Sequence, residues 1–283
     1  MQKTTRAFTR YTTRGVLTAI ACLLGVAFAL PLLWMIASAF RPQDEIFRFL
    51  SPLSLNALLP TRITFDNFNN LLNGPFLDTL GNSLLVAAAT IVLGLIVSTL
   101  AAFALSITRF RFREVIFGIV IISALIPFEA ISIPLSDLFR TWQLRDTYAG
   151  LILPGLANGM AIFLLRQFFL GIPEELKEAA QVDGANLLTI LLKIYIPLAR
   201  PALIGAGLIF FVGQWQAFLW PLLVVSQPQM NLAPVQLAQF LGQYSFDFGT
   251  LFAGALMLSV IPMLVVLPLQ RYFIQSVATT GSK

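Results

Sequence analysis

The sequence predicts an all-α membrane protein with six membrane-spanning helices and both termini in the cytoplasm. Its 283 residues are 58% hydrophobic and 11% charged, whereas soluble domains average about 45–50% apolar and about 25% charged residues. Long apolar stretches are separated along the chain by short charged segments, while the strands of a membrane β-barrel would show alternation over about ten residues. The pattern therefore favours helical spans.

The first predicted span covers residues 16–40 and follows a polar, basic N-terminal segment over residues 1–15. Its mostly apolar stretch of about 25 residues is long enough to cross a hydrocarbon core about 30 Å thick. The competing interpretation is a secretory signal peptide, because Ala37-Ser38-Ala39 resembles a cleavage site. Signal peptides have apolar regions of only about 7–15 residues, so the length favours a membrane anchor.

Five more spans are predicted in the rest of the chain. They lie at about residues 84–107, 115–135, 148–167, 202–225 and 250–269. The transmembrane domain is therefore expected to cover residues 16–272, followed by a cytoplasmic tail over residues 273–283. Residues 41–80 contain four prolines, which break helices, and are expected to fold over the outer face.

The basic residues test this topology. Of the 18 Lys and Arg residues, 13 fall in segments that the topology places in the cytoplasm and five fall outside. Cytoplasmic loops of membrane proteins carry an excess of Lys and Arg, so this distribution supports the assignment. The net charge of +5 therefore reflects orientation signals, and binding to nucleic acid is not expected.

The longest charged segment is the predicted cytoplasmic loop over residues 171–201. Pro173 suits the first position of a helix, and Glu174 and Glu175 follow in the first turn, where the helix dipole favours acids. On such a helix one face holds Glu174, Lys177, Glu178 and Gln181, and the other holds Leu176, Ala179, Ala180 and Asp183. The second face is shallow, and Gly184 would end the helix in a turn. We predict a docking helix; the alternative is a solvated connector without a partner.

The same loop carries a family resemblance. Its key residues are Glu178, Ala179, Ala180, Gly184, Ile194 and Pro197. Their spacing resembles the EAA loop of the membrane subunits of bacterial ATP-binding-cassette importers. The chain departs from that pattern at Ile196, where the family usually has leucine. The flanking segments FLLRQFF, GIPEEL and PLARPAL, and the ITFDNF segment with Asn82-Ser83, look more narrowly like carbohydrate permeases of the maltose-transporter type.

The resemblance implies a type I importer permease fold in the bacterial inner membrane and a set of partners. These are a second homologous permease, two copies of a cytoplasmic ATPase that bind MgATP, and an external solute-binding protein. The ATPase would act through the coupling residues Glu174, Glu175, Glu178, Ala179, Ala180, Asp183 and Gly184. Import would proceed by alternating access, and residues 226–249 resemble the family's receptor-contacting outer loop. The implied substrate is a carbohydrate, either an oligosaccharide or a polyol glycoside.

Four residues are candidates for the substrate pathway. Glu129 lies within the third predicted span, where an ionisable group costs at least about 2.5 kcal/mol and suggests a function. A solvated helix end or a contact with a partner is the alternative. Gln214, Trp215 and Gln216 combine amides and an aromatic ring, which suit the hydroxyls and C–H faces of a sugar. They could instead bond or pack against neighbouring helices. The family commonly has an acid at the position of Ala217.

Several functions are not supported by the sequence. It contains no histidine, one cysteine and no Gly-x-x-x-x-Gly-Lys-Ser/Thr phosphate loop. We therefore expect a non-catalytic subunit without a metal site or a cofactor of its own, with ATP hydrolysis in a partner chain. Within the importer class, glycerol phosphate or another small polar solute is the alternative substrate. Outside it, the alternatives are a stand-alone channel, a secondary carrier or a membrane scaffold.

Overall fold

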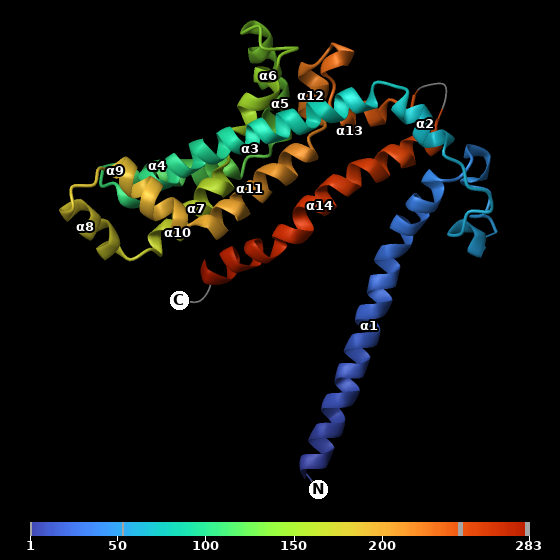
Figure 1. Cartoon of the computed structure of the whole chain (residues 1–283), viewed down its shortest axis with the longest axis horizontal. Coiled ribbons are helices and arrows are strands. Elements are labelled where there is room, and N and C mark those ends of the chain that lie inside the picture. Colours follow the sequence, from blue (N-terminus) through green and yellow to red (C-terminus); the bar gives the residue numbers. More distant parts are fainter. Residues whose placement is uncertain (1, 53, 243–245, 281–283) are drawn as a thin grey trace. The chain divides into compact units, whose positions relative to one another are not determined.

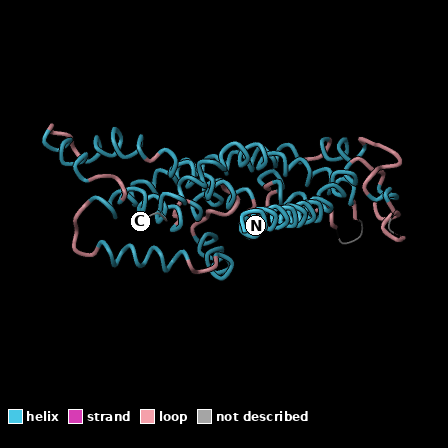
Figure 2. The backbone as a smooth tube through the Cα atoms, turned by 90° about the horizontal axis from the view of Figure 1, so that it is seen from below, coloured by secondary structure: helices cyan, strands magenta, loops and turns pink. Residues whose placement is uncertain are grey.

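The computed structural model describes residues 2–52, 54–242 and 246–280, and these residues form helices and loops with no strand (Figure 2). The chain folds as two units, each described here by itself. Unit 1 comprises residues 1–74 and 237–257, and unit 2 comprises residues 75–236 and 258–283. The long C-terminal helix α14 (Phe248–Thr280) contributes to both.

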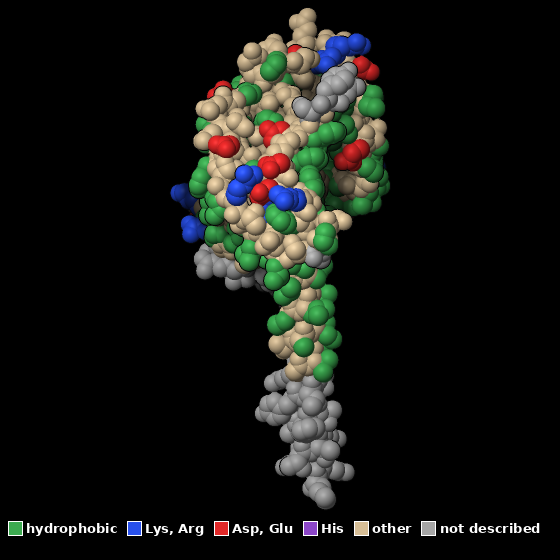
Figure 3. Space-filling view, turned by 90° about the vertical axis from the view of Figure 1, so that its right-hand side faces the viewer, with side chains coloured by type: hydrophobic (Ala, Val, Ile, Leu, Met, Phe, Trp, Pro, Cys, Tyr) green, Lys and Arg blue, Asp and Glu red, His purple; other side chains and the backbone are tan. Residues whose placement is uncertain are grey.

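Unit 1 begins with a single long helix. Its elements are α1 (Gln2–Ala39), the 3₁₀ turns η1 (Gln43–Glu45) and η2 (Leu55–Ala57), α2 (Asp66–Leu72) and the start of α14 (Figure 1). Over Gly15–Ala39, α1 is long and apolar enough to cross a membrane. Hydrophobic side chains cover this part of the helix (Figure 3). The predicted N-terminal anchor is therefore a continuous helix.

Asn67 holds unit 1 together at the end of α1. Its side-chain nitrogen donates to the carbonyls of Ala39 and Arg41, at 2.9 and 2.8 Å. The last carbonyls of a helix lack partners within the helix, so this amide satisfies one of them. A Cβ at Gly249 would lie 2.3 Å from Oδ1 of Asn67, so only glycine lets α14 start this close to α2. The Asn in the ITFDNF segment therefore has a structural role.

Unit 2 is a bundle of packed and broken helices. In order, it contains α3 (Phe76–Ile107), α4 (Arg113–Ala124), α5 (Phe128–Thr141), α6 (Tyr148–Ile152), η3 (Leu153–Gly155), α7 (Gly159–Leu170), α8 (Glu174–Val182), α9 (Leu187–Ile190), the π-helical η4 (Leu191–Tyr195), α10 (Ile196–Leu198), α11 (Arg200–Trp215), α12 (Leu219–Val224), η5 (Pro228–Met230) and most of α13 (Ala233–Ala238). Helices α3, α7 and α11 pack on one another and form its centre (Figure 1).

By length and composition, the described chain offers up to six spans. Three are single helices, Gly15–Ala39, Phe76–Ile107 and Phe248–Gln270. The other three are bent pairs: α4 with α5 at 96°, α6–η3 with α7 at 46°, and Leu187–Leu198 with α11 at 83°. The helix expected over residues 115–135 is thus two helices that turn sharply at Pro127. The helix expected over residues 202–225 ends at Trp215 and resumes at Leu219.

The broken helices meet in space. A Cβ at Gly159, the first residue of α7, would lie 2.6 Å from Cβ of Ala124, the last residue of α4. Similarly, a Cβ at Gly155 would lie 3.4 Å from Oε1 of Gln214, near the end of α11. The breaks at residues 125–127, 156–158 and 216–218 therefore lie close to one another, and the glycines allow this close approach.

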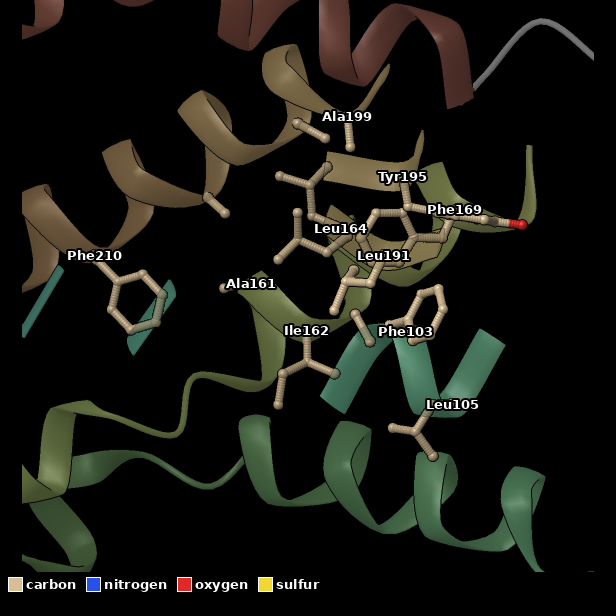
Figure 4. Close-up of a cluster of buried hydrophobic side chains, with 14 of the residues drawn as sticks. Phe103, Leu105, Ala161, Ile162, Leu164, Phe169, Leu191, Tyr195, Ala199 and Phe210 are labelled. Atoms are coloured by element: carbon tan, nitrogen blue, oxygen red, sulfur yellow. The ribbon is translucent and has the colours of Figure 1, made fainter. Parts of the chain in front are cut away.

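Two hydrophobic clusters flank these breaks. The larger joins α3, α7, η4 and α11, and Figure 4 shows its side chains converging between those helices. At its centre, Phe103, Phe169 and Tyr195 meet edge to face, with ring centroids 5.2–6.2 Å apart. The smaller cluster contains Val86, Phe139, Leu151, Trp220, Val224 and Leu232. The bundle therefore has a packed core on either side of the level where its helices break.

Candidate functional site

The predicted docking helix is α8, which lies at one end of unit 2 (Figure 1). Pro173 precedes it with φ −54° and ψ 131°, and Glu174 and Glu175 occupy its first turn. At its other end Gly184 has φ +79° and donates to the carbonyl of Gln181 at 3.0 Å. Because non-glycine residues rarely adopt this left-handed conformation, the turn that ends α8 depends on glycine.

One side of α8 is attached to the rest of unit 2. The Lys177 ammonium, only 12% exposed, donates to Oε1 of Glu174 at 2.9 Å, and Nη2 of Arg109 donates to the same oxygen at 3.3 Å. The hydrogen bond from Lys177, with the positive charges of both bases, lowers the pKa of Glu174. Ala180 packs against the larger hydrophobic cluster. Glu174 and Ala180 therefore attach α8 to the rest of unit 2.

The opposite side of α8 is exposed. Glu175, Leu176, Glu178, Ala179, Val182 and Asp183 face outward. Val182 is 88% exposed, and among the described residues no base lies within ion-pair distance of Glu175, Glu178 or Asp183. The exposed face thus differs from the one expected from the sequence, because Leu176 and Ala179 point away from the bundle while Ala180 points into it. An apolar patch surrounded by unpaired acids suits a basic protein partner.

A buried arginine lies on α7, the helix before α8, and sequence reasoning missed its role. Arg166 on α7 is 6% exposed. Its Nη2 donates to both carboxylate oxygens of Glu114 at 2.8 and 2.9 Å, and its Nε donates to the Leu105 carbonyl at 2.9 Å. Its guanidinium lies 3.9 Å from the ring centroid of Phe117. A single arginine between apolar residues in FLLRQFF was the available signal, since an unpaired charge is not stable there.

The pathway candidates do not form one site. Trp215 is 7% exposed, and its indole nitrogen donates to the Leu258 carbonyl at 3.2 Å. Gln214 is half-buried beside Gly155, while Gln216 is exposed. Glu129 is exposed in the first turn of α5, directly after the break at Pro127. Gln214 and Glu129 therefore lie at helix breaks, and Trp215 joins two helices.

Thr90 is a further polar residue at these breaks. It is 1% exposed, and its hydroxyl has no hydrogen-bond partner in the structure. A Cβ at Gly155 would touch Thr90 Cγ2 at 2.8 Å, so Thr90 and Gln214 approach the same glycine. Breaks in membrane helices commonly line the binding sites of transporters, because the freed backbone groups need polar partners. The polar side chains of Thr90 and Gln214 therefore lie together around Gly155, inside the bundle.

Apolar spans, broken helices with polar residues and a short exposed helix at one end define the class of polytopic membrane transport subunits. Residues 94–279 match the family model described as "Binding-protein-dependent transport system inner membrane component", and the chain belongs to this family. It is therefore an inner-membrane permease component of an ABC importer. The predicted family and all-α permease fold are confirmed, while the orientation of the termini remains a prediction.

Relatives support the same assignment. The chain is 35% identical to the arabinooligosaccharides transport system permease AraQ of Halalkalibacterium halodurans, over 89% of this chain and 90% of that protein. It is 32% identical to the sn-glycerol-3-phosphate transport system permease UgpE of Escherichia coli, over 89% and 92%. A solved bacterial ABC transporter involved in the import of the acidic polysaccharide alginate superposes with a TM-score of 0.77 at 27% identity, over 92% and 96%.

Proposed function

We propose that this chain pairs with a second, homologous permease to import a carbohydrate, driven by two copies of a cytoplasmic ATPase. An external solute-binding protein delivers the substrate. The observation that carries this proposal is the exposed acidic face of α8, which is attached to the bundle by Lys177 and Ala180 on its other side. A helix attached on one side and free on the other can transmit the movement of a bound partner to the spans.

The ATPase docks on the outward face of α8 in this proposal. Glu175, Glu178 and Asp183 pair with basic residues of the ATPase, and Val182 and Ala179 fill a shallow apolar cleft. Glu174 serves from the inner side, since its carboxylate holds Lys177 and Arg109. Gly184 sets the direction in which the chain leaves the helix. MgATP binds to the partner, and its hydrolysis resets the transporter through this contact.

The substrate passes the helix breaks of unit 2. Gln214 offers a half-buried amide beside Gly155, and amide groups can donate to and accept from sugar hydroxyls. Gln216 and Glu129 are exposed at two of these helix breaks and are further candidates for contact with the substrate, while Trp215 keeps α11 in place. The names of two relatives, which refer to arabinooligosaccharides and to alginate, favour a carbohydrate.

Glycerol phosphate is the second candidate substrate. The specific observation in its favour is the 32% identity to the glycerol-3-phosphate permease. An anion pathway requires a positive charge that faces it, and the second permease could supply one. Transport measured with each class of solute distinguishes the two candidates.

Affinity purification in mild detergent from the native membrane tests the proposal. A tag on this chain should retain an ATPase, a second polytopic permease and a solute-binding protein. Proteoliposomes of that complex should transport the ligand of the binding protein only when MgATP is present on the side of the membrane where the ATPase lies. Uptake by this chain alone, without ATP, would contradict the proposal and favour a channel or carrier.

A further inference from the structure

The turn between α3 and α4 carries more positive charge than its neighbours balance. Arg109, Arg111 and Arg113 line a pocket of about 480 Å³ together with Phe110, Glu114 and Val115. Arg109 binds Glu174, and Arg113 binds Glu114 and the Ser106 carbonyl. Arg111 is exposed, lies 5.5 Å from the Phe112 ring and, among the described residues, has no carboxylate within ion-pair distance. The pocket therefore has one arginine available to an anion.

Helix α4 continues from this pocket with an apolar outer face. Val115, Ile119 and Ile122 are 60%, 60% and 64% exposed. Their spacing of four and three residues places them on one face of the helix. The opposite face packs on α7, where the ring of Phe117 stacks with that of Phe163 at 6.2 Å. The outer face is thus separate from the contacts that hold α4 in the bundle.

Dimensions and charge identify the occupant. From Val115 to Ile122 the apolar face of α4 extends roughly 10 Å at about 1.5 Å per residue, which fits within one leaflet. One leaflet of hydrocarbon is roughly 15 Å thick, half of a core of about 30 Å. A positive group at one end of an apolar stripe of this length matches a phosphate headgroup followed by an acyl chain. The basic protein partner proposed for α8 would be repelled by the positive charge of this turn, so it is not the occupant here.

We infer that the α3–α4 turn and the outer face of α4 bind an anionic phospholipid. The headgroup phosphate lies against Arg111 in the arginine pocket, and an acyl chain lies along Val115, Ile119 and Ile122. The inference rests on the topology of the proposed function, which places this turn at the cytoplasmic surface, where anionic headgroups attract basic residues. The bound phospholipid connects the α3–α4 turn to the membrane next to α8, which contacts the same turn through Arg109 and Glu174.

Lipid retention by the intact complex tests this inference. The complex, purified through a tag on the full chain, is equilibrated in nanodiscs of equal phosphatidylglycerol and phosphatidylcholine and released into detergent. Native mass spectrometry then counts each retained lipid. Wild type should retain phosphatidylglycerol preferentially. Arg111→Gln should reduce that retention about fivefold, the equivalent of about 1 kcal/mol for one arginine near an anionic headgroup.

Two further variants separate the parts of the site. Ile119→Asn should also reduce retention of phosphatidylglycerol, because its side chain interrupts the apolar stripe, while Arg140→Gln, a change at an exposed arginine on α5, should not. Excess inorganic phosphate should displace little lipid. Unchanged retention of phosphatidylglycerol in Arg111→Gln or in Ile119→Asn would overturn the inference, and so would displacement of the lipid by inorganic phosphate alone. A cross-link from the outer face of α4 to another subunit, with no lipid retained, would also overturn it. Recovery of the ATPase is counted in the same spectra, so failure of the proposed function is read separately.

Discussion

The indole nitrogen of Trp215 donates a hydrogen bond of 3.2 Å to the carbonyl oxygen of Leu258. In an uninterrupted helix that carbonyl would accept from the residue four positions later. In α14 this residue is Pro262, which has no N–H to donate. Trp215 therefore supplies the donor that Pro262 removes, and it connects the end of α11 to a bend-prone point of α14. An unpaired carbonyl at that depth would be costly, because hydrocarbon offers no substitute partner.

Trp215→Phe keeps the ring but removes this donor. The buried carbonyl is then unsatisfied, so we expect a loss of about 1–3 kcal/mol in stability and a lower melting temperature of the purified complex. The matched control is Trp142→Phe, since Trp142 is 59% exposed and should tolerate the change. In Pro262→Ala, α14 regains its own donor, so Trp215→Phe should cost less in that background. Equal costs in both backgrounds would contradict the hydrogen-bond argument.

Ala179→Trp tests the exposed face of α8. Ala179 points outward, so the new side chain should leave the fold intact but prevent close contact with the ATPase. Overpacking of a contact costs about 1–3 kcal/mol, which corresponds to a loss of about 5- to 150-fold in affinity for the ATPase. Copurification and ATP-dependent uptake measure the loss, and Ala130→Trp at an exposed position of α5 is the control.

Ala180→Trp should behave differently from Ala179→Trp. Ala180 packs against the larger hydrophobic cluster of unit 2, so a larger side chain there would push α8 away from the bundle. We expect a lower melting temperature in addition to lost transport. If Ala179→Trp lowered the melting temperature equally, or if both variants transported normally, the assignment of inner and outer faces of α8 would be wrong.

Gly184→Ala tests the turn after α8. No atom lies within 4 Å of a Cβ built at Gly184, so the change causes no collision. Its φ of +79° is nevertheless unfavourable for alanine by about 1–2 kcal/mol. Gly213→Ala is the matched control, because a Cβ there also meets open space but lies within α11 in a helical conformation. We expect reduced ATPase retention in the first variant and unchanged or improved stability in the second.

Much of the fold follows from the sequence because the bilayer imposes a strong constraint. Apolar length gives α1, α3 and α14, and Pro173 with Gly184 delimits α8. The break at Pro127 was not predicted, since proline is also tolerated within membrane helices, as Pro134 in α5 shows. The break after Trp215 was not predicted either, because residues 216–218 contain no proline or glycine that would signal it. Local sequence gives a possible kink, while packing decides whether the helix bends or stops.

The candidate site was harder to predict, because it depends on which face of a helix packs. Helical periodicity groups Ala179 with Ala180, yet the bundle covers only Ala180. Likewise, composition marks Trp215 as a sugar contact, and only the distant Pro262 and Leu258 explain its hydrogen bond. Such long-range relationships are set by tertiary contacts between helices that are about 40 residues apart, which a periodic pattern does not contain.

The Glu174 contacts predict a pH dependence. Lys177 and Arg109 lower the pKa of Glu174 below its unfolded value, so the contacts stabilise the fold at pH values above the unfolded pKa. This stability is lost as pH falls through the lowered pKa of the folded state. We expect the melting temperature of wild type to fall more steeply below about pH 5 than that of Glu174→Gln, which has no carboxylate to protonate. Glu175→Gln, which removes an unpaired carboxylate, is the control, and equal slopes in wild type and Glu174→Gln would contradict this role.

Arg166→Lys should destabilise unit 2 although it keeps the positive charge. Leu105 lies in the last turn of α3, where carbonyls have no partner within the helix, and Nε of Arg166 satisfies it at 2.9 Å. The same guanidinium binds both oxygens of Glu114 and stacks on Phe117. An ammonium cannot make these three contacts at once, because it lacks the planar fork.

We expect Arg166→Lys to cost about 1–3 kcal/mol through the unsatisfied carbonyl, and Arg166→Met to cost more because it also removes the positive charge, which leaves Glu114 with Arg113 alone. The measurement is the melting temperature of the complex in one detergent, with Arg140→Lys as an exposed control. Glu114→Gln should have a smaller effect, since its carboxylate is 63% exposed and solvent can replace the arginine. The opposite result would be a wild-type melting temperature in Arg166→Lys and a lowered one in Glu114→Gln. In that case the ion pair with Glu114, and not the hydrogen bond to the Leu105 carbonyl, would be the stabilising contact at this end of α3.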